Sequence, residues 1–275
     1  MTIRERPAGV ADLWRTPMSV PPTPLTKRQL TTETVLVLLL SLGASAIYSL
    51  LSIIRRLVVA AQTNTSLNQQ SSSLNTSQAQ QQWLDFIYQV VGIALALVPA
   101  ILVIHLLGRE MTSATRYLGF DLTRPKFDLS LGALLAACVG IPGLALYVIA
   151  RDLGFNTTVV ASGLGDTWWS WPVLIASAAQ NAIVEEVIML GYLFTRWTQA
   201  GWRLPAVLIT SAVVRGSYHL YQGFGGFLGN LIMGLIFGLV YLRVRRVLPM
   251  VVAHTILDTV AFVGYALLHN NVGWL

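Results

Sequence analysis

Two adjacent glutamates, Glu185 and Glu186, lie in the middle of an apolar run that is long enough to cross a membrane as a helix. The apolar runs that follow contain four more ionisable residues: Arg215, His219, His254 and Asp258. A lone charge in mid-membrane costs about 2.5–3.5 kcal/mol on insertion scales, so such groups are expected to face one another or a water-filled cavity. The residue types therefore predict one convergent polar site inside a helical bundle.

Hydrolysis is the chemistry that this set of side chains could perform. A glutamate in an apolar site can take a proton from water, and a histidine can share that role. A second histidine and a carboxyl group can stabilise the oxyanion of a tetrahedral intermediate. A bound Zn²⁺ is the open alternative, with Glu185, His219 and His254 as candidate ligands. The zinc-protease signature His-Glu-x-x-His is absent from the sequence, so the metal rests on residue types alone.

The depth and the spacing of these residues both predict that they meet. At 1.5 Å per residue, their positions fall in one layer, about 10–20 Å below the same membrane surface. Helical spacing predicts a polar stripe on each of three runs, namely Asn181, Glu185 and Tyr192; Ser211, Arg215, His219 and Gln222; and His254 with Asp258. We expect the three stripes to face a common cavity that is open to the cytoplasm.

The composition is that of an integral membrane protein. Of the 275 residues 55% are hydrophobic and only 11% are charged, whereas a soluble domain is about 25% charged. Seven runs are candidates for spanning helices: 35–54, 84–107, 129–150, 172–195, 205–222, 226–242 and 248–268. The least certain of them is 205–222, which contains Arg215 and His219. The sequence predicts an all-α polytopic transmembrane bundle of about seven spans.

The positive charges predict the orientation. Fourteen of the 18 Lys and Arg residues fall before the first run or in the connections that share its side of the membrane. The positive-inside rule then places the N-terminus in the cytoplasm. This pattern accounts for the basic net charge of +6 through topology and lipid contact, and we expect no nucleic-acid partner. The expected location is a bacterial cell membrane, as a multi-pass protein.

Three segments are expected along the chain. Residues 1–33 form a cytoplasmic basic tail, 34–170 hold three plain apolar helices, and 171–275 form a catalytic helical core. Within the second segment, the uncharged polar stretch 62–82 is predicted to be a flexible outer linker. Tryptophans 168, 169 and 171 fit an aromatic belt at the membrane interface.

The motifs in the last segment resemble the CAAX-protease and bacteriocin-processing (CPBP) family of intramembrane endopeptidases. The resemblance covers 171–262 and rests on Glu185-Glu186, on "RGSYHLYQG" with His219, and on "AHTILD" with His254 and Asp258. It implies a helical membrane protease whose relatives trim the ends of prenylated CAAX proteins. In that mechanism a glutamate and His219 would activate water, while His254 and Asp258 would stabilise the oxyanion.

Two positions depart from the family pattern. Leu190 stands where the first motif carries an arginine, and Arg215 stands where the second motif carries a phenylalanine. Two neighbouring carboxylates in lipid would repel one another without a cation. We therefore expect Arg215 to supply the charge balance from the facing helix.

Two other functions stay open at this point. The chain could be a non-catalytic member of the same family with an immunity or partner-binding role, and the missing arginine favours that reading slightly. A proton-coupled transporter is the third reading, but the first half offers no polar helix to match the second. The leading reading is an endopeptidase that cuts a protein or peptide at the membrane.

Overall fold

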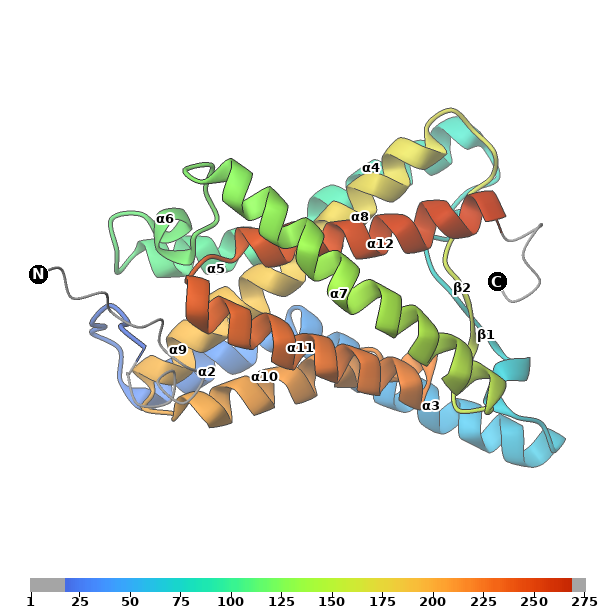
Figure 1. Cartoon of the computed structure of the whole chain (residues 1–275), viewed down its shortest axis with the longest axis horizontal. Coiled ribbons are helices and arrows are strands. Elements are labelled where there is room, and N and C mark those ends of the chain that lie inside the picture. The colour runs from blue at the N-terminus through green and yellow to red at the C-terminus, as the bar shows by residue number, and fades with distance from the viewer. Residues whose placement is uncertain (1–17, 269–275) are drawn as a thin grey trace, which may run out of the picture.

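The computed structural model describes residues 18–268, which form a helical bundle with two short strands (Figure 1). Among these residues six helices are long and apolar enough to cross a membrane. Their bounds are Leu42–Thr63, Gln82–Gly108, Pro125–Asp152, Ser170–Gln199, Phe224–Val244 and Leu248–Leu268. The seventh expected run, 205–222, is a shorter apolar helix, Leu204–Tyr218. The prediction of an all-α polytopic bundle is confirmed.

The elements follow one another in this order: α2 (Lys27–Leu39), α3 (Leu42–Thr63), β1 (Ser71–Ser73), α4 (Gln82–Ala96), α5 (Val98–Gly108), α6 (Ala114–Leu118), α7 (Pro125–Asp152), β2 (Thr158–Val160), α8 (Ser170–Glu186), α9 (Leu193–Gln199), α10 (Leu204–Tyr218), α11 (Phe224–Val244) and α12 (Leu248–Leu268). A π-helical turn, Val187–Tyr192, joins α8 to α9, and a 3₁₀ turn, Leu220–Gln222, joins α10 to α11. Most of the expected tail 1–33 lies outside the described residues, but α2 already begins at Lys27.

The first expected span, 35–54, has the wrong bounds. The helix breaks at Leu40–Ser41, and the helix long enough to span is α3. Ser41 leaves the helical conformation, with φ −144° and ψ −120°, and its hydroxyl donates to the Val37 carbonyl at 2.6 Å. Serine hydroxyls that bond locally to the backbone compete with the helical ladder. The apolar pattern runs through both helices, so hydropathy could not locate this break.

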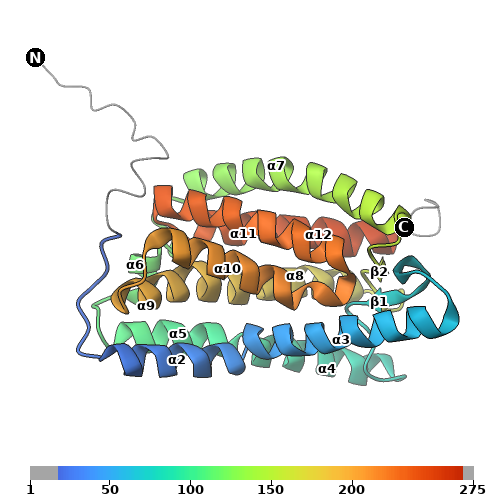
Figure 2. The ribbon, with the colours of Figure 1, turned by 90° about the horizontal axis from the view of Figure 1, so that it is seen from below.

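The helices form three layers (Figure 2). The collinear pairs α2–α3 and α5–α4 form one outer layer, and α8, α9 and α10 lie in the middle. Helices α11, α12 and α7 cover the other side, and α7 packs against both α11 and α12. The residues with the chemistry of interest therefore sit on middle-layer helices and on α12, which packs against α8.

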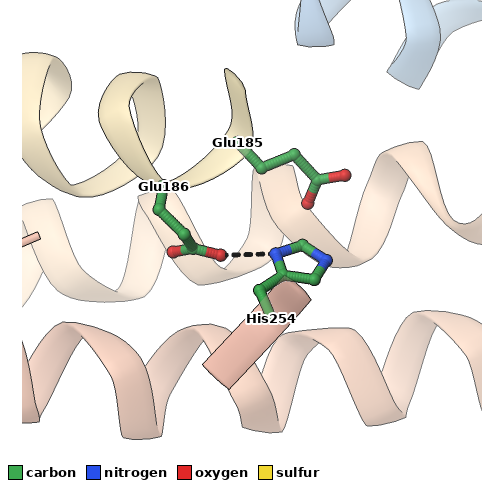
Figure 3. A group of neighbouring side chains, drawn as sticks. All are labelled: Glu185, Glu186 and His254. Atoms are coloured by element: carbon green, nitrogen blue, oxygen red, sulfur yellow. Dashed lines mark hydrogen bonds and ion pairs between the residues drawn. The ribbon is translucent and has the colours of Figure 1, made fainter. Parts of the chain in front are cut away.

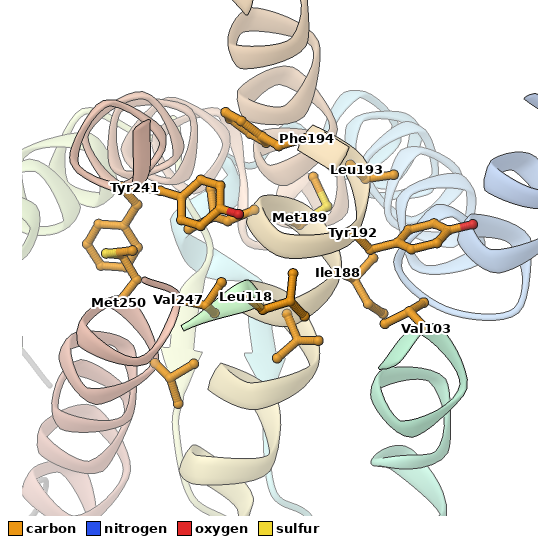
Figure 4. Packing of buried hydrophobic residues seen from close by; sticks show 14 of the residues in the cluster. Val103, Leu118, Ile188, Met189, Tyr192, Leu193, Phe194, Tyr241, Val247 and Met250 are labelled. Atoms are coloured by element: carbon orange, nitrogen blue, oxygen red, sulfur yellow. The ribbon is translucent and has the colours of Figure 1, made fainter. Parts of the chain in front are cut away.

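The π-helical turn Val187–Tyr192 lies within the buried hydrophobic core (Figure 4). Every residue from Val184 to Trp197 is buried, and the side chains of Leu118, Val247 and Met250 pack against this segment. A π turn leaves carbonyls without their usual helical partners, and such turns often occur at functional sites. Here the Ser211 hydroxyl on α10 donates to the Met189 carbonyl at 3.0 Å. The turn is thus stabilised by the facing helix.

Two buried arginines fix the end of the bundle that carries most positive charge. Arg196, with 0% exposure, binds Glu33 of α2 at 2.8 Å and Glu110 at 2.8 Å. Arg246 binds Asp128 at the start of α7 through two bonds of 2.7 Å. Both cations join segments that are distant in the sequence.

A further carboxylate, Asp121, completes the Arg246 cluster outside the membrane-spanning helices. Hydrogen bonds from Thr123 and then the charge of Arg246 lower the pKa of Asp121 to about 2. Because the folded pKa lies below the ordinary value of 3.8, this group stabilises the fold above pH 4. That contribution is lost as the pH falls toward 2.

The polar stretch 62–82 is not the flexible linker that its composition predicted. β1 pairs in parallel with β2, with Ser72 opposite Val159. The Ser72 hydroxyl bonds to Thr157 at 2.8 Å and to the Tyr221 carbonyl at 2.9 Å. Hydroxyl and amide side chains satisfy neighbouring backbone groups, and low-complexity composition does not reveal those pairings.

The tryptophans at the start of α8 differ from one another. Trp168 is 83% exposed and Trp171 is 46% exposed, as an interfacial belt requires. Trp169 is only 4% exposed, and its ring lies 5.7 Å from that of Phe86 on α4. Trp169 therefore anchors α4 to α8 and is not part of the belt.

We predict that the 62–82 segment lies outside the cell. Ser72 is buried at 2% exposure, whereas Ser73 is exposed, so the reporter is Ser73→Cys in a Cys138→Ala background. A membrane-impermeant maleimide should label this variant on intact cells, because most of the positive charges lie at the other end of the bundle. Labelling that requires lysis would reverse the orientation.

Candidate active site

The last turn of α8 carries both glutamates, and the helix directs them into different surroundings (Figure 3). Consecutive residues on an α-helix point about 100° apart. Glu185 lines a cavity and is 9% exposed, whereas Glu186 is fully buried. The adjacent carboxylates are therefore not equivalent.

Glu186 is held by a cation and a histidine. Arg215 on α10 donates to Glu186 Oε2 at 2.7 Å, and His254 Nδ1 on α12 lies 2.8 Å from Oε1 (Figure 3). Both carboxylate oxygens thus have a partner, which is what a buried charge requires. The same guanidinium lies over the Phe237 ring, 5.8 Å from its centroid.

Glu185 has a different set of neighbours. The Tyr218 hydroxyl donates to Glu185 Oε2 at 2.6 Å, and Arg215 Nη1 lies 3.6 Å from the same oxygen. Because both contacts are to Oε2, the other oxygen is left for a molecule in the cavity. Arg215 therefore lies between the two glutamates and bonds directly to the one that is fully buried.

His219 comes immediately after the last residue of α10, where the helix ends inside the bundle. Its Nδ1 lies 3.1 Å from the Arg215 carbonyl oxygen. A carbonyl oxygen only accepts, so Nδ1 carries the hydrogen in this contact. In the neutral ring Nε2 then has a lone pair, and His219 lines the same cavity as Glu185.

Asp258 lies one helical turn after His254 on α12. One carboxylate oxygen is 3.6 Å from His254 Nε2, and the other accepts from the Asn181 amide at 3.5 Å. Both His254 and Asp258 line the cavity. Asn181 on α8 thus connects the helix that carries the glutamates to the one that carries His254.

The cavity has a volume of about 570 Å³. Its floor holds Glu185, Tyr218, His219, His254 and Asp258. Its walls include the helix break at 40–42, the junction of α4 and α5 at 96–99, and Leu74 and Asn75 from the 62–82 segment. The space is large enough for several residues of an extended peptide.

The cavity extends in the direction opposite to the one expected. On the side of Arg196 the glutamates are backed by the packed turn Val187–Tyr192. On the other side the cavity runs toward Ser177, Phe262 and Asn75. With the orientation predicted from the charges this second end is the outer one, so a cavity open to the cytoplasm does not fit that orientation. The spacing of residues along the helices does not tell which end of the bundle is filled by side chains.

The donor set fits zinc poorly. Ligand atoms of Glu185, Glu186 and His254 lie within 4.8 Å of one another. However, Glu186 and His254 hydrogen-bond to each other, and the guanidinium of Arg215 lies 2.7 Å from Glu186 and 3.6 Å from Glu185. A zinc ion bound there would have to break the first contact and stand beside a fixed cation. His219, the third ligand candidate, is outside the group of three.

We predict that chelator-washed protein holds far less than one equivalent of zinc. The reason is the positive charge that Arg215 already places beside both carboxylates. Metal content per protein, measured by plasma mass spectrometry after dialysis into metal-free buffer, checks this. One tightly held equivalent that disappears in His254→Ala would show that a metal displaces the hydrogen bonds described above.

Sequence reasoning missed one residue and misplaced another. Tyr218 donates a hydrogen bond to the Glu185 carboxylate, and a tyrosine beside a histidine at a helix end gave no periodic signal. Tyr192 was expected on the stripe of Asn181 and Glu185, but its hydroxyl donates to Glu33 at 2.8 Å. The intervening π turn changes the helical register, so spacing by 3.6 residues fails beyond Glu186.

Comparison with known proteins agrees with the motifs. Residues 167–260 match the family model described as type II CAAX prenyl endopeptidase Rce1-like. No curated protein matches the chain. No solved structure matches it either. The matched segment contains both glutamates, His219, His254 and Asp258. Residues 167–260 of this integral membrane protein are thus similar to the Rce1-like CAAX endopeptidases, and the resemblance expected from the motifs is confirmed.

Proposed function

We propose that the chain is an intramembrane endopeptidase that hydrolyses a peptide bond with a glutamate-activated water. The observation that carries the proposal is that the two glutamate carboxylates have different hydrogen-bond partners and different access to the cavity. Glu186 is bonded on both oxygens, whereas Glu185 keeps one oxygen toward a cavity large enough for a peptide. The Rce1-like match supports a peptide substrate.

The reaction begins at Glu185. Its cavity-facing oxygen accepts a proton from water while the water oxygen forms a bond to the carbonyl carbon of the substrate. The carbonyl π electrons move to oxygen and give a tetrahedral oxyanion. When the C–N bond breaks, the proton passes to the leaving nitrogen, and the products are a carboxylic acid and an amine.

The two histidines take different parts in this proposal. His219 presents Nε2 to the cavity and can accept or relay a proton near the attacking water. His254 and Asp258 lie on the facing helix, where a ring N–H is suited to the developing oxyanion. Arg215 balances the glutamate charges and is not among the residues that line the cavity.

The test combines a chosen probe with an open search. Full-length protein in proteoliposomes is incubated with a fluorescence-quenched, farnesylated CAAX peptide, and membranes expressing the same protein are examined for new peptide ends. Protein carrying Glu185→Ala is the matched control. Cleavage that depends on Glu185 is expected. Absence of such cleavage in both assays would favour a non-catalytic, partner-binding member of the family.

A further inference from the structure

We infer that Tyr218 is a positioning residue for Glu185, so that its hydroxyl orients the carboxylate which activates water. This inference rests on the proposed function and adds a residue to it. The Tyr218 hydroxyl donates to Glu185 Oε2 at 2.6 Å, and both residues line the cavity. The tyrosine itself is buried, at 5% exposure.

The end of α10 explains how Tyr218 and His219 can serve the same cavity. On a continuous helix, neighbours in sequence point about 100° apart. Here the helix ends at Tyr218, and His219 adopts φ −102° and ψ 1° before the 3₁₀ turn begins. The two rings lie 4.7 Å apart at 41°, and both residues line the same cavity as Glu185.

Arg215 does not donate a hydrogen bond to Glu185, so Tyr218 is the donor to this carboxylate. Its Nη2 bonds to Glu186, while Nη1 is buried without a hydrogen-bond partner and lies 3.6 Å from Glu185. That distance is too long for a direct hydrogen bond. Arg215 therefore supplies charge to Glu185, and Tyr218 supplies the directed bond. No other hydrogen bond to the Glu185 carboxylate is present among residues 18–268.

The hydrogen bond from Tyr218 affects both the orientation and the protonation of the Glu185 carboxylate. A hydrogen bond from a neutral donor stabilises an ionised carboxylate and fixes the plane of its two oxygens. With Oε2 held by Tyr218, Oε1 is aimed at the space where water and substrate meet. A general base must be placed within hydrogen-bond reach of the proton it removes, so a freely rotating carboxylate would be a poorer base.

The first test is Tyr218→Phe, which removes only the hydroxyl. We expect kcat for the fastest-cleaved peptide to fall about 10- to 100-fold, since hydrogen bonds to charged groups contribute on that scale. KM and the melting temperature should stay close to the original values. Tyr147→Phe is the matched control, because its hydroxyl accepts from Val159 N at 2.9 Å and lies away from the glutamates. An unchanged kcat in Tyr218→Phe would overturn the inference.

A second readout does not need proteolysis. Dicyclohexylcarbodiimide modifies protonated carboxyl groups in apolar surroundings, and mass spectrometry locates the adduct. Tyr218→Phe should raise the rate of adduct formation at Glu185 about 10-fold or more, because the bond that stabilises the ionised form is gone. Equal rates in both proteins would overturn the inference even if the protein cleaves nothing. A protein without cleavage but with the rate change would instead refute the proposed function alone.

If Tyr218→Phe fails to fold, fluorotyrosine at position 218 replaces it. The ring and hydroxyl are kept, but the hydroxyl is a stronger donor. Both kcat and the carbodiimide rate should then differ from the original protein while the melting temperature does not. Identical values for both would overturn the inference.

Discussion

Arg215→Phe should lower the free energy of unfolding by about 3–5 kcal/mol and abolish cleavage. Removing one partner of a buried ion pair leaves the other charge buried and unpaired. Arg215 is 1% exposed and lies 2.7 Å from Glu186 and 3.6 Å from Glu185, so its loss affects both carboxylates. Unfolding of the purified protein by a graded detergent titration, together with the peptide assay, measures the two effects.

Two second-site changes separate charge from packing. Adding Glu186→Gln to Arg215→Phe removes the carboxylate that was left unpaired, and stability should recover by more than half. Adding Leu190→Arg instead places a cation four residues after Glu186, inside the π turn, and should recover part of the activity. Arg215→Lys is the milder comparison, since it keeps the charge but loses the planar fork.

A harmless Arg215→Phe would contradict this account. It would mean that the glutamate pair is held by protonation alone. Recovery with neither second-site change would show instead that the loss comes from the phenylalanine ring and not from the missing charge.

The sequence indicated which residues form the site, because charged side chains inside a membrane are costly unless they contact one another or water. Glu185, Glu186, Arg215, His254 and Asp258 all meet where three apolar runs converge, and a high cost per buried charge makes that outcome predictable. The helical class followed from the same physics, since backbone groups in lipid must bond within a helix.

What the sequence did not indicate depends on local departures from the regular helix. The break at Ser41, the π turn after Glu186 and the end of α10 at Tyr218 each change which side chain points where. Hydropathy and a period of 3.6 residues assume regular geometry, so Tyr192 was misplaced and Tyr218 was missed. The ordered 62–82 segment was missed because its stability comes from pairing with β2, which is distant in the sequence.

Substitution by glutamine should affect mainly activity at Glu185 and mainly stability at Glu186. Glu185→Gln should lower kcat at least 100-fold, as expected for loss of a general base, with the melting temperature nearly unchanged. Glu185 is partly open to the cavity, and an amide oxygen can still accept from Tyr218. The substitution therefore removes basicity without leaving a buried group unpaired.

Glu186→Gln should instead lower stability by about 3–5 kcal/mol, because it leaves the fully buried Arg215 without its closest counter-ion. It also replaces the charged carboxylate next to His254, whose Nδ1 lies 2.8 Å from Glu186 Oε1, by a neutral amide. Activity per folded molecule should fall less than in Glu185→Gln. Unfolding titrations and single-turnover cleavage on the two variants, prepared side by side, measure this contrast.

A reversal of the two phenotypes would assign the base to Glu186. That outcome would require the His254–Glu186 contact to open before water could reach the carboxylate, because both of its oxygens are bonded in the structure. Equal loss of activity and stability in both variants would mean that the pair acts as one coupled unit. The expected contrast arises because one position on the helix faces a cavity and the next faces a fixed cation, which is why two adjacent carboxylates can have separate roles in this membrane protein.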